Sequence, residues 1–301
     1  MGKIAFVFPG QGSQFVGMGK DLYQDSREIM DSANDTLGFS LTDIMFDGPI
    51  DSLKQTNVTQ PAIFLHSVTL LQKIKSFKPD MVAGHSLGEY SALVAAGAIE
   101  FIDALKLVRT RGQAMLQAGI EQPGTMAAVI GLQPDAVEKI CDEASANGIV
   151  QCANFNSPGQ IVISGSVDGV KSAMTIAKEQ GAKLVKELVV SGAFHSPLMA
   201  SAKEKLLSKL DETNINNATI PVYANVTAKP VTESSEIKKL LFDQLSSPVR
   251  WEESVINMIA DGATEFVEIG PGKVLQGLIK RIDKNVKVWG IEKLKDLEKL
   301  N

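Results

Sequence analysis

The segment at residues 84–88 has a serine with a glycine two positions before it and another two positions after it, a spacing suited to nucleophilic catalysis. Residues 84–88 read Gly-His-Ser-Leu-Gly, so Ser86 stands at the centre of a G-x-S-x-G pattern. In a nucleophile elbow of this kind the serine sits on a strained turn between a strand and a helix, and its hydroxyl attacks an acyl carbon. The flanking glycines leave room where the strand and the helix approach each other. The pattern predicts acyl chemistry at Ser86, with a packed glycine-rich turn as the alternative.

The segments around Ser86 favour the elbow. Residues 80–83 form a short apolar run typical of a buried strand, and residues 87–98 are rich in alanine and predict a helix. Ser86 would then lie at a helix N-terminus. Unpaired backbone N–H groups and the positive end of the helix dipole favour a developing oxyanion at such a place.

A serine nucleophile needs a base, and the sequence contains three histidines. His66 lies in the long amphipathic helix expected at 58–77, where a lone histidine among apolar neighbours is more often a core residue than a ligand. His85 precedes Ser86, and we expect its side chain to point away from the serine. His195 lies in a loop with serine, glycine and proline neighbours, which makes it the best candidate base. The alternative is that His195 caps the helix that follows it.

No acid is in an obvious position to complete a Ser-His-Asp triad. In α/β-hydrolase esterases the acid comes between the serine and the histidine in the sequence. Asp135, Asp142 and Asp168 occur there, but they belong to a separate small domain predicted for residues 125–190. We therefore expect a neutral acceptor, such as a backbone carbonyl, to orient His195.

Two further residues are candidates for substrate contacts. Gln11 lies in a glycine-rich loop after the apolar strand 3–8, and this loop lacks the spacing of a dinucleotide fingerprint and the lysine of a P-loop. It can still present an amide to a substrate, with an exposed turn as the alternative. The second is one of the two arginines, Arg109 and Arg111, on the amphipathic helix 101–118, where an arginine is commonly solvated or salt-bridged. A substrate with a free carboxylate nevertheless needs such a planar, permanently charged donor.

Composition limits the class of protein. The length of 301 residues predicts about two domain-sized units. The hydrophobic content of 44% is enough for the chain to bury a sizeable core. The 30 basic and 35 acidic residues give a net charge of −5, which argues against nucleic-acid binding. The two cysteines, Cys141 and Cys152, lack metal-ligand spacing, so we expect reduced core residues of a cytoplasmic protein. No secretory signal and no apolar run of membrane-spanning length is evident.

The order of the expected elements divides the chain into two domains. Residues 125–190 predict the order β-α-β-β-α-β of the ferredoxin-like split motif, inserted into an α/β domain that comprises 1–124 and 191–301. An inserted domain creates a cleft, where substrate sites usually lie. Strands are expected at 3–8, 80–83, 126–130, 149–155, 160–164, 183–190, 221–225, 265–269 and 286–289, and helices at 58–77, 87–98, 101–118, 134–146, 167–179, 197–212, 236–246 and 251–260.

Several motifs, in a fixed order from residue 4 to about residue 289, point to one family. They are Phe-Pro-Gly-Gln-Gly-Ser-Gln at 8–14, Gly-His-Ser-Leu-Gly-Glu at 84–89, Arg-Gly at 111–112, Ala-Asn-Phe-Asn-Ser-Pro-Gly-Gln at 153–160, Ile-Ser-Gly at 163–165, Gly-Ala-Phe-His-Ser at 192–196 and Glu-Ile-Gly-Pro-Gly at 268–272. Together these motifs resemble the malonyl-CoA:acyl carrier protein transacylases of fatty acid synthesis. No catalytic position departs from the family pattern. With the elbow, the resemblance predicts an α/β-hydrolase-like large domain with a parallel sheet core.

The resemblance implies roles for seven residues. They are the nucleophile Ser86 and its base His195; an oxyanion hole made by Gln11 and the backbone N–H of Leu87; Arg111, which would pair with the malonyl carboxylate; Gln244, whose backbone carbonyl would orient the histidine; and Asn154, on the substrate side. The form Gly-Ala-Phe-His at 192–195 resembles the one that accompanies malonyl rather than methylmalonyl selection.

The implied reaction is ping-pong acyl transfer, which needs neither a metal nor an organic cofactor. Malonyl-CoA acylates the serine, and the phosphopantetheine thiol of acyl carrier protein then takes the malonyl group. The expected partners are these two molecules, with no nucleic acid and no membrane, and the expected state is a monomer. Three alternatives remain: a discrete polyketide acyltransferase with the same chemistry, a serine esterase or thioesterase, and a non-catalytic binding module. Arg111 and the missing acid count against the hydrolase, and the intact Ser86 and His195 count against the module.

Overall fold

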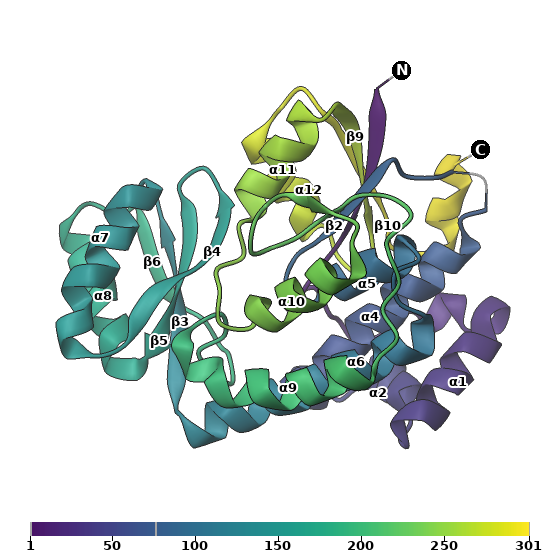
Figure 1. Cartoon of the computed structure of the whole chain (residues 1–301), viewed down its shortest axis with the longest axis horizontal. Helices are drawn as coiled ribbons and strands as arrows, with labels where there is room; N and C mark the ends of the chain where they lie inside the picture. The colour runs from purple at the N-terminus through teal and green to yellow at the C-terminus, as the bar shows by residue number, and fades with distance from the viewer. Residues whose placement is uncertain (1, 76, 301) are drawn as a thin grey trace.

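The computed structural model describes residues 2–75 and 77–300, and within them the chain forms two separate sheets (Figure 1). The larger sheet has six described strands in the spatial order β10 (Lys287–Ile291), β9 (Ala263–Ile269), β1 (Lys3–Phe8), β2 (Met81–Gly84), β7 (Val222–Tyr223) and β8 (Pro230–Val231). Neighbouring strands are parallel, except that β8 is antiparallel to β7. The expectation of an α/β fold with a mainly parallel sheet is confirmed.

Both faces of the larger sheet are covered, which explains why β1 is apolar from Ile4 to Phe8. Phe6 and Phe8 pack into one core, and the alternate residues Ala5 and Val7 pack into another. The first core is built with α4 (Thr56–Lys73), α5 (Gly88–Ala95) and α6 (Phe101–Glu121), and the second with α11 (Trp251–Ala260) and α12 (Val274–Ile282). The other helices of this unit are α1 (Arg27–Leu37), α2 (Leu41–Asp47), α3 (Ile50–Leu53), α9 (Ala200–Glu212) and α10 (Ser234–Gln244).

The smaller sheet lies wholly between residues 124 and 187. Its strands are antiparallel, in the spatial order β4 (Val150–Ser157), β5 (Gln160–Ser166), β3 (Gly124–Ile130) and β6 (Leu184–Glu187). The helices α7 (Pro134–Ala144) and α8 (Val167–Glu179) cover its outer face, as Figure 1 shows at the left. Cys141 and Cys152 are buried between these helices and the sheet as free thiols.

Strand β4 joins the two units through backbone pairing. The N–H of Phe155 donates to the carbonyl of Val249 at 2.9 Å, and the N–H of Val249 donates to the carbonyl of Ala153 at 2.8 Å. This pair forms a parallel bridge between the small sheet and the segment after α10. The bridge fixes β4 beside the large unit.

The helix expected at 58–77 differs from the observed α4 in two ways. The helix ends at Lys73, and Ser76 lies outside the described residues. It is also not amphipathic, because every residue from 58 to 70 is buried. The reason is its position: α4 packs against α5, α6 and the sheet, so it has no solvent-facing side over this length.

Two expected strands are shorter in the structure. The strand expected at 183–190 is limited to β6, and residues 188 and 190 instead line a cavity beside Ser86. The strand expected at 221–225 is limited to β7. Two residues after its end, the Asn225 side chain bonds to the turn at Ser86, so the chain leaves the ladder there.

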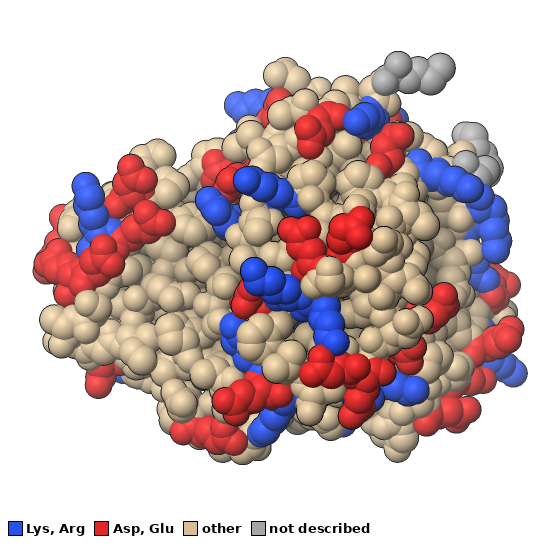
Figure 2. Space-filling model, in the orientation of Figure 1, with Lys and Arg blue, Asp and Glu red and all other residues tan. Residues whose placement is uncertain are grey.

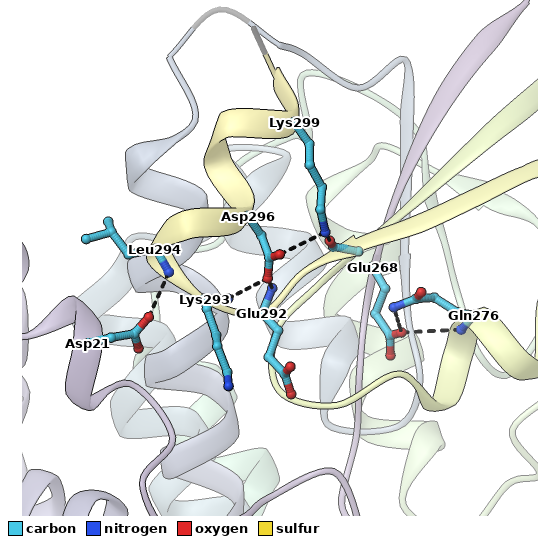
Figure 3. A network of polar contacts seen from close by, with 9 residues as sticks. Asp21, Glu268, Gln276, Glu292, Lys293, Leu294, Asp296 and Lys299 are labelled. Carbon is cyan, nitrogen blue, oxygen red and sulfur yellow. Dashed lines mark hydrogen bonds and ion pairs between the residues drawn. The ribbon is translucent and has the colours of Figure 1, made fainter.

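The C-terminal segment is held against the large unit by carboxylates that accept backbone hydrogen bonds (Figure 3). Asp296 accepts from the N–H groups of Glu292 and Lys293, both at 3.0 Å, and Asp21 accepts from the N–H of Leu294 at 2.8 Å. Asp21 belongs to the first of the 3₁₀ turns, which are η1 (Lys20–Leu22), η2 (Gln24–Ser26), η3 (Ser145–Asn147), η4 (Pro197–Met199) and η5 (Leu294–Leu300).

Charges of both signs are distributed over the visible face of the molecule. Figure 2 shows lysine and arginine side chains interspersed with aspartate and glutamate, with acidic side chains gathered at the outer end of the small unit. Among the residues that the structure describes, no helix combines the length and the apolar character needed to cross a bilayer.

Candidate active site

Ser86 lies on a sharp turn between β2 and α5. Its φ of 52° falls in the left-handed region, which is strained for a residue with a side chain. The glycines on either side are sterically required. A Cβ on Gly84 would lie 1.9 Å from the carbonyl carbon of Gly88, and a Cβ on Gly88 would lie 2.0 Å from the carbonyl oxygen of Phe8. The structure thus has the nucleophile-elbow geometry predicted from the G-x-S-x-G pattern.

His195 contacts the serine directly. The Nε2 atom of His195 lies 2.8 Å from the Oγ atom of Ser86, and its Nδ1 atom lies 2.9 Å from the backbone carbonyl oxygen of Gln244. A carbonyl only accepts, so Nδ1 carries the proton and Nε2 is left to accept from the Ser86 hydroxyl. Gln244 is the last residue of α10, where carbonyls have no partner within the helix. That is why its carbonyl can bond the histidine.

The surroundings of His195 keep its imidazole neutral. The side chain is 3% exposed, and burial, followed by the nearby charge of Arg111, lowers the pKa of His195 to about 3. A neutral imidazole can accept the serine proton at any ordinary pH.

Arg111 reaches the same serine from α6. Its NH2 atom lies 3.0 Å from Ser86 Oγ and 3.0 Å from Gln244 Oε1, and its NH1 atom lies 2.8 Å from Gln60 Oε1. The residue is fully buried, and burial lowers its pKa. Within the described residues no carboxylate lies within 4.0 Å of the guanidinium, and its Nε atom has no partner. Neutral acceptors do not neutralise a buried guanidinium, so an anionic ligand can form an ion pair with it.

The two residues expected to form an oxyanion hole lie on either side of the cavity at Ser86. Leu87 is the residue before α5, and its N–H makes no hydrogen bond within the described part of the chain. Gln11 lies in the exposed loop after β1, and its Nε2 atom is 3.4 Å from Thr56 Oγ1. The contact is long, so the Gln11 amide is held loosely.

Asn154 and Asn156 bring the small unit to the site. Asn154 is 6% exposed on β4 and lines the cavity. Asn156, which the sequence did not single out, accepts a hydrogen bond from His85 Nε2 at its Oδ1 atom, over 2.8 Å. The His85 ring therefore bonds to β4 and not to Ser86. His85 lines the same cavity, but its ring nitrogen bonds to Asn156, which agrees with the expectation that the side chain points away from the serine.

Three residues behind the site were missed from the sequence. Asn225 accepts from the Ser86 N–H at 2.7 Å and donates to the Gly84 carbonyl at 2.6 Å, so it holds both sides of the turn. Gln60 bonds to Arg111, and Glu89 bonds to Gln244 at 2.8 Å. Glu89 could have been found from the sequence, because it is the last residue of the motif around Ser86. No sequence pattern marks Asn225 or Gln60.

A cavity of about 230 Å³ connects these groups to the surface between the two units. Ser86, Arg111 and His195 are among the polar residues that line it. Its apolar lining includes Met126, Val162, Leu188, Val190, Val274 and Leu278. A lining that combines a few polar groups with apolar side chains is typical of a small-molecule site.

Comparison with known proteins identifies the family. Residues 5–293 match the family model described as acyl transferase domain. The chain is 48% identical to the malonyl CoA-acyl carrier protein transacylase of Bacillus subtilis strain 168, over 99% of this chain and 96% of that protein. A relative with the same name from Staphylococcus aureus is 45% identical over 100% of this chain and 99% of its own length.

Solved structures agree with the sequence comparison. The fold matches an acyl carrier protein S-malonyltransferase from Vibrio cholerae with a TM-score of 0.95 and 44% identity, covering 99% of this chain and 100% of that one. It also matches a malonyl-transacylase in complex with its type II PKS acyl-carrier protein, with a TM-score of 0.94, 39% identity and 98% coverage of each chain. The chain therefore belongs to the acyl transferase domain family, in its branch of malonyl CoA-acyl carrier protein transacylases.

Proposed function

We propose that this protein transfers a malonyl group from malonyl-CoA to the phosphopantetheine thiol of acyl carrier protein, for fatty acid biosynthesis. One observation carries the proposal: the Ser86 hydroxyl oxygen lies 2.8 Å from His195 Nε2 and 3.0 Å from Arg111 NH2 in one cavity. The first contact supplies a nucleophile with its base. The second contact places a cation within reach of the free carboxylate of a malonyl group esterified to the serine.

In the first half-reaction, Ser86 Oγ attacks the thioester carbon of malonyl-CoA while His195 Nε2 takes its proton. The tetrahedral intermediate carries negative charge on the former carbonyl oxygen. The unpaired Leu87 N–H and the Gln11 amide are the donors for that oxyanion. When the C–S bond breaks, His195 returns the proton to the departing CoA thiolate, and malonyl remains on Ser86 as an ester.

The second half-reaction reverses these steps with a new thiol. The phosphopantetheine thiol of the carrier gives its proton to His195 and attacks the ester carbon. The C–O bond to Ser86 breaks, and His195 returns the proton to the serine oxygen. The Gln244 carbonyl holds the imidazole in one tautomer throughout.

Arg111 sets the preference for malonyl. Its guanidinium is bonded to neutral acceptors, so a malonyl carboxylate would give it an ionic partner. An acetyl group would leave it without one, at a cost on the order of 2 to 5 kcal/mol. Asn154 lines the same cavity and would contact the bound acyl group.

We also propose the finer description of the architecture. The large domain, 1–124 and 191–301, is of the α/β-hydrolase-like kind, supported by an elbow between a parallel strand and a helix. The small domain, 125–190, is ferredoxin-like, supported by its element order and by the strand order β4-β5-β3-β6. The protein acts as a monomer in the cytoplasm.

A polyketide pathway is the second candidate for the source of the carrier. The similarity to a malonyl-transacylase in complex with its type II PKS acyl-carrier protein favours it. The chemistry at Ser86 would be the same.

Intact-protein mass spectrometry after brief mixing with malonyl-CoA tests the first half-reaction. We expect a malonyl adduct on the wild type and none on Ser86→Ala. Acetyl-CoA under the same conditions should give little adduct. A wild type that gains no mass, or an Ser86→Ala variant that still does, would contradict the proposal.

A further inference from the structure

Glu89 is a buried carboxylate behind the site, to which the proposed mechanism gives no role. It lies on α5, three residues after Ser86, and is 3% exposed. Its Oε2 atom accepts from the backbone N–H of Asn225 at 3.0 Å and from Gln244 Nε2 at 2.8 Å. Neither donor is charged. A carboxylate removed from water without an ion pair is costly, so its retention here calls for a function.

The partner of Glu89, Gln244, connects all three groups of the site. Its side-chain nitrogen also donates to the Ser86 carbonyl at 3.0 Å, and its side-chain oxygen accepts from Arg111 at 3.0 Å. Its backbone carbonyl accepts from His195. The position of this one residue therefore affects the nucleophile, the base and the arginine together.

A glutamine amide is nearly symmetric in shape but not in chemistry. If the Gln244 amide were turned by 180°, its NH₂ would face the Arg111 guanidinium and its oxygen would face two acceptors, the Ser86 carbonyl and Glu89. An ionised carboxylate can only accept, so Glu89 permits one orientation of the amide. A neutral amide in place of Glu89 could turn its own NH₂ group toward Gln244, so it would no longer enforce this orientation, which only Arg111 and the Ser86 carbonyl would then maintain.

We propose that Glu89 is a positioning residue whose carboxylate, acting through Gln244, holds Arg111 and His195 in register with Ser86. The proposal rests on the proposed acyl transfer at Ser86. Glu89 itself touches neither substrate nor the reacting atoms.

The electrostatic surroundings of Glu89 give the proposal a pH signature. Burial raises the pKa of Glu89 to about 7, partly offset by its hydrogen bonds and by the charge of Arg111 on α6. Tyr90 on α5 is the other titratable group coupled to it, with a pKa raised to about 12 by burial; α10 and the segment after β7 contribute the neutral Gln244 and Asn225. Because burial lowers the pKa of His195 to about 3, the base does not titrate near neutrality.

Glu89→Gln tests the proposal, with the rate of the first acylation by malonyl-CoA measured in single turnovers from pH 5.5 to 8.5. In the wild type we expect the rate to fall as the pH drops through the range where Glu89 takes up a proton. In Glu89→Gln we expect a rate about 10- to 100-fold lower above pH 8, without that pH dependence. Glu89→Asp keeps a carboxylate, which can only accept, and should restore part of the rate relative to Glu89→Gln.

Glu268→Gln is the matched control, because Glu268 is also buried and also accepts hydrogen bonds from uncharged donors. It accepts from the N–H of Leu275 at 3.1 Å and from the side-chain amide of Gln276 at 3.0 Å, the second of which Figure 3 shows. Among the described residues it has no hydrogen bond to Ser86, His195 or Gln244. Burial raises its pKa to about 7 as well. We expect this variant to keep the pH dependence of the wild type and a rate within about threefold of it.

A double-mutant cycle of Glu89→Asp with Gln244→Met tests whether Glu89 acts on the rate through the Gln244 side chain. The cycle does not need Glu89→Gln, so it tests the proposal even if that variant folds poorly. If Glu89 acts through the amide, Glu89→Asp should cost little once Gln244 is methionine. Equal losses in both backgrounds, or a Glu89→Gln variant that behaves like Glu268→Gln, would overturn the proposal. A wild type that forms no malonyl adduct would instead refute the acyl transfer itself.

Discussion

Arg111 is the residue whose surroundings say most about the substrate. It is fully buried, yet within the described residues its hydrogen bonds go to glutamine and serine oxygens and not to a carboxylate. A structural arginine in a core is normally paired with an acid. We therefore propose that the ligand supplies the missing anion, and the 3.0 Å contact with Ser86 Oγ would place that anion close to an ester formed on the serine.

Arg111→Ala should lose malonyl transfer and gain relative activity with acetyl-CoA. The loss of an ionic partner for malonyl predicts a fall in kcat/KM on the order of 10- to 1000-fold. Acetyl transfer should fall less or rise, because no desolvated guanidinium is left unpaired. Steady-state rates with both substrates measure the ratio.

Arg109→Ala is the matched control for that substitution. Arg109 lies two residues earlier on α6, is partly exposed, and donates to the Asn57 carbonyl at 2.6 Å. We expect the malonyl-to-acetyl ratio of this variant to equal that of the wild type. A similar change of the ratio in both variants would remove Arg111 from the specificity site.

Among the secondary-structure elements, the elbow depends on the close approach of β1, β2 and α5. Their backbones can come this close because Gly84 and Gly88 have no side chains. Strand β1 ends beside the turn, β2 enters it, and α5 leaves it. The Asn225 side chain ties the turn from a fourth segment. The strain at Ser86 is stored there because these contacts leave the backbone no alternative conformation.

Gly88→Ala should disrupt the elbow. Its Cβ would lie 2.0 Å from the Phe8 carbonyl oxygen, which belongs to a buried strand and cannot move away cheaply. We expect a loss of roughly 2 kcal/mol or more in the free energy of unfolding and a loss of acylation at Ser86. Urea unfolding and adduct formation measure the two effects.

Gly277→Ala is the opposite case in the same chain. Gly277 lies inside α12 and has open space where a Cβ would be added. Because alanine favours a helix interior, this variant should be more stable by about 0.5 to 1 kcal/mol and fully active. If Gly88→Ala were equally harmless, the steric account of the elbow would be wrong.

The sequence predicted those parts of the site that depend on local patterns. The glycines around Ser86 and the exclusion of His66 and His85 were enough to single out Ser86 and His195. Gln60 and Asn225 could not be found this way, because their partners Arg111 and Ser86 are 51 and 139 residues away. Ordinary amides carry no local signal of such long-range contacts. Periodicity likewise failed for α4, where burial on all sides removed the polar stripe.

At the scale of the whole molecule, the site exists because two units share one cavity. The order of elements predicted both units, and the structure adds the bridge at Val249 that fixes β4 against the large one. Asn154 and Asn156 on β4 line the same cavity as Ser86, and the bridge pairs Asn154 itself with Val249. Its geometry depends on backbone pairing between distant segments, which no pattern in the sequence encodes.

The free energy of unfolding should depend on pH through His66, a buried histidine outside the cavity at Ser86. Burial lowers the pKa of His66 from its ordinary value of 6.5 to about 4. The unfolded chain then binds a proton that the folded chain does not, so the stabilising contribution is complete above pH 6.5 and is lost as the pH falls toward 4.

His66→Leu isolates this effect, because the other titrating groups are shared with the wild type. Between pH 7 and pH 4.5, we expect the wild type to lose about 2 kcal/mol more unfolding free energy than the variant. Urea unfolding at the two pH values measures the difference. Equal losses would mean that His66 is not held neutral by burial.

Transfer to the carrier is the measurement that tests the central claim most directly. Wild-type protein carrying a malonyl group on Ser86 would be mixed with acyl carrier protein bearing its phosphopantetheine arm, and both masses followed over time. The account predicts that malonyl leaves the serine and appears on the carrier, much faster than it leaves in buffer alone. Loss of the adduct at the same rate with and without carrier would show transfer to water and contradict the account.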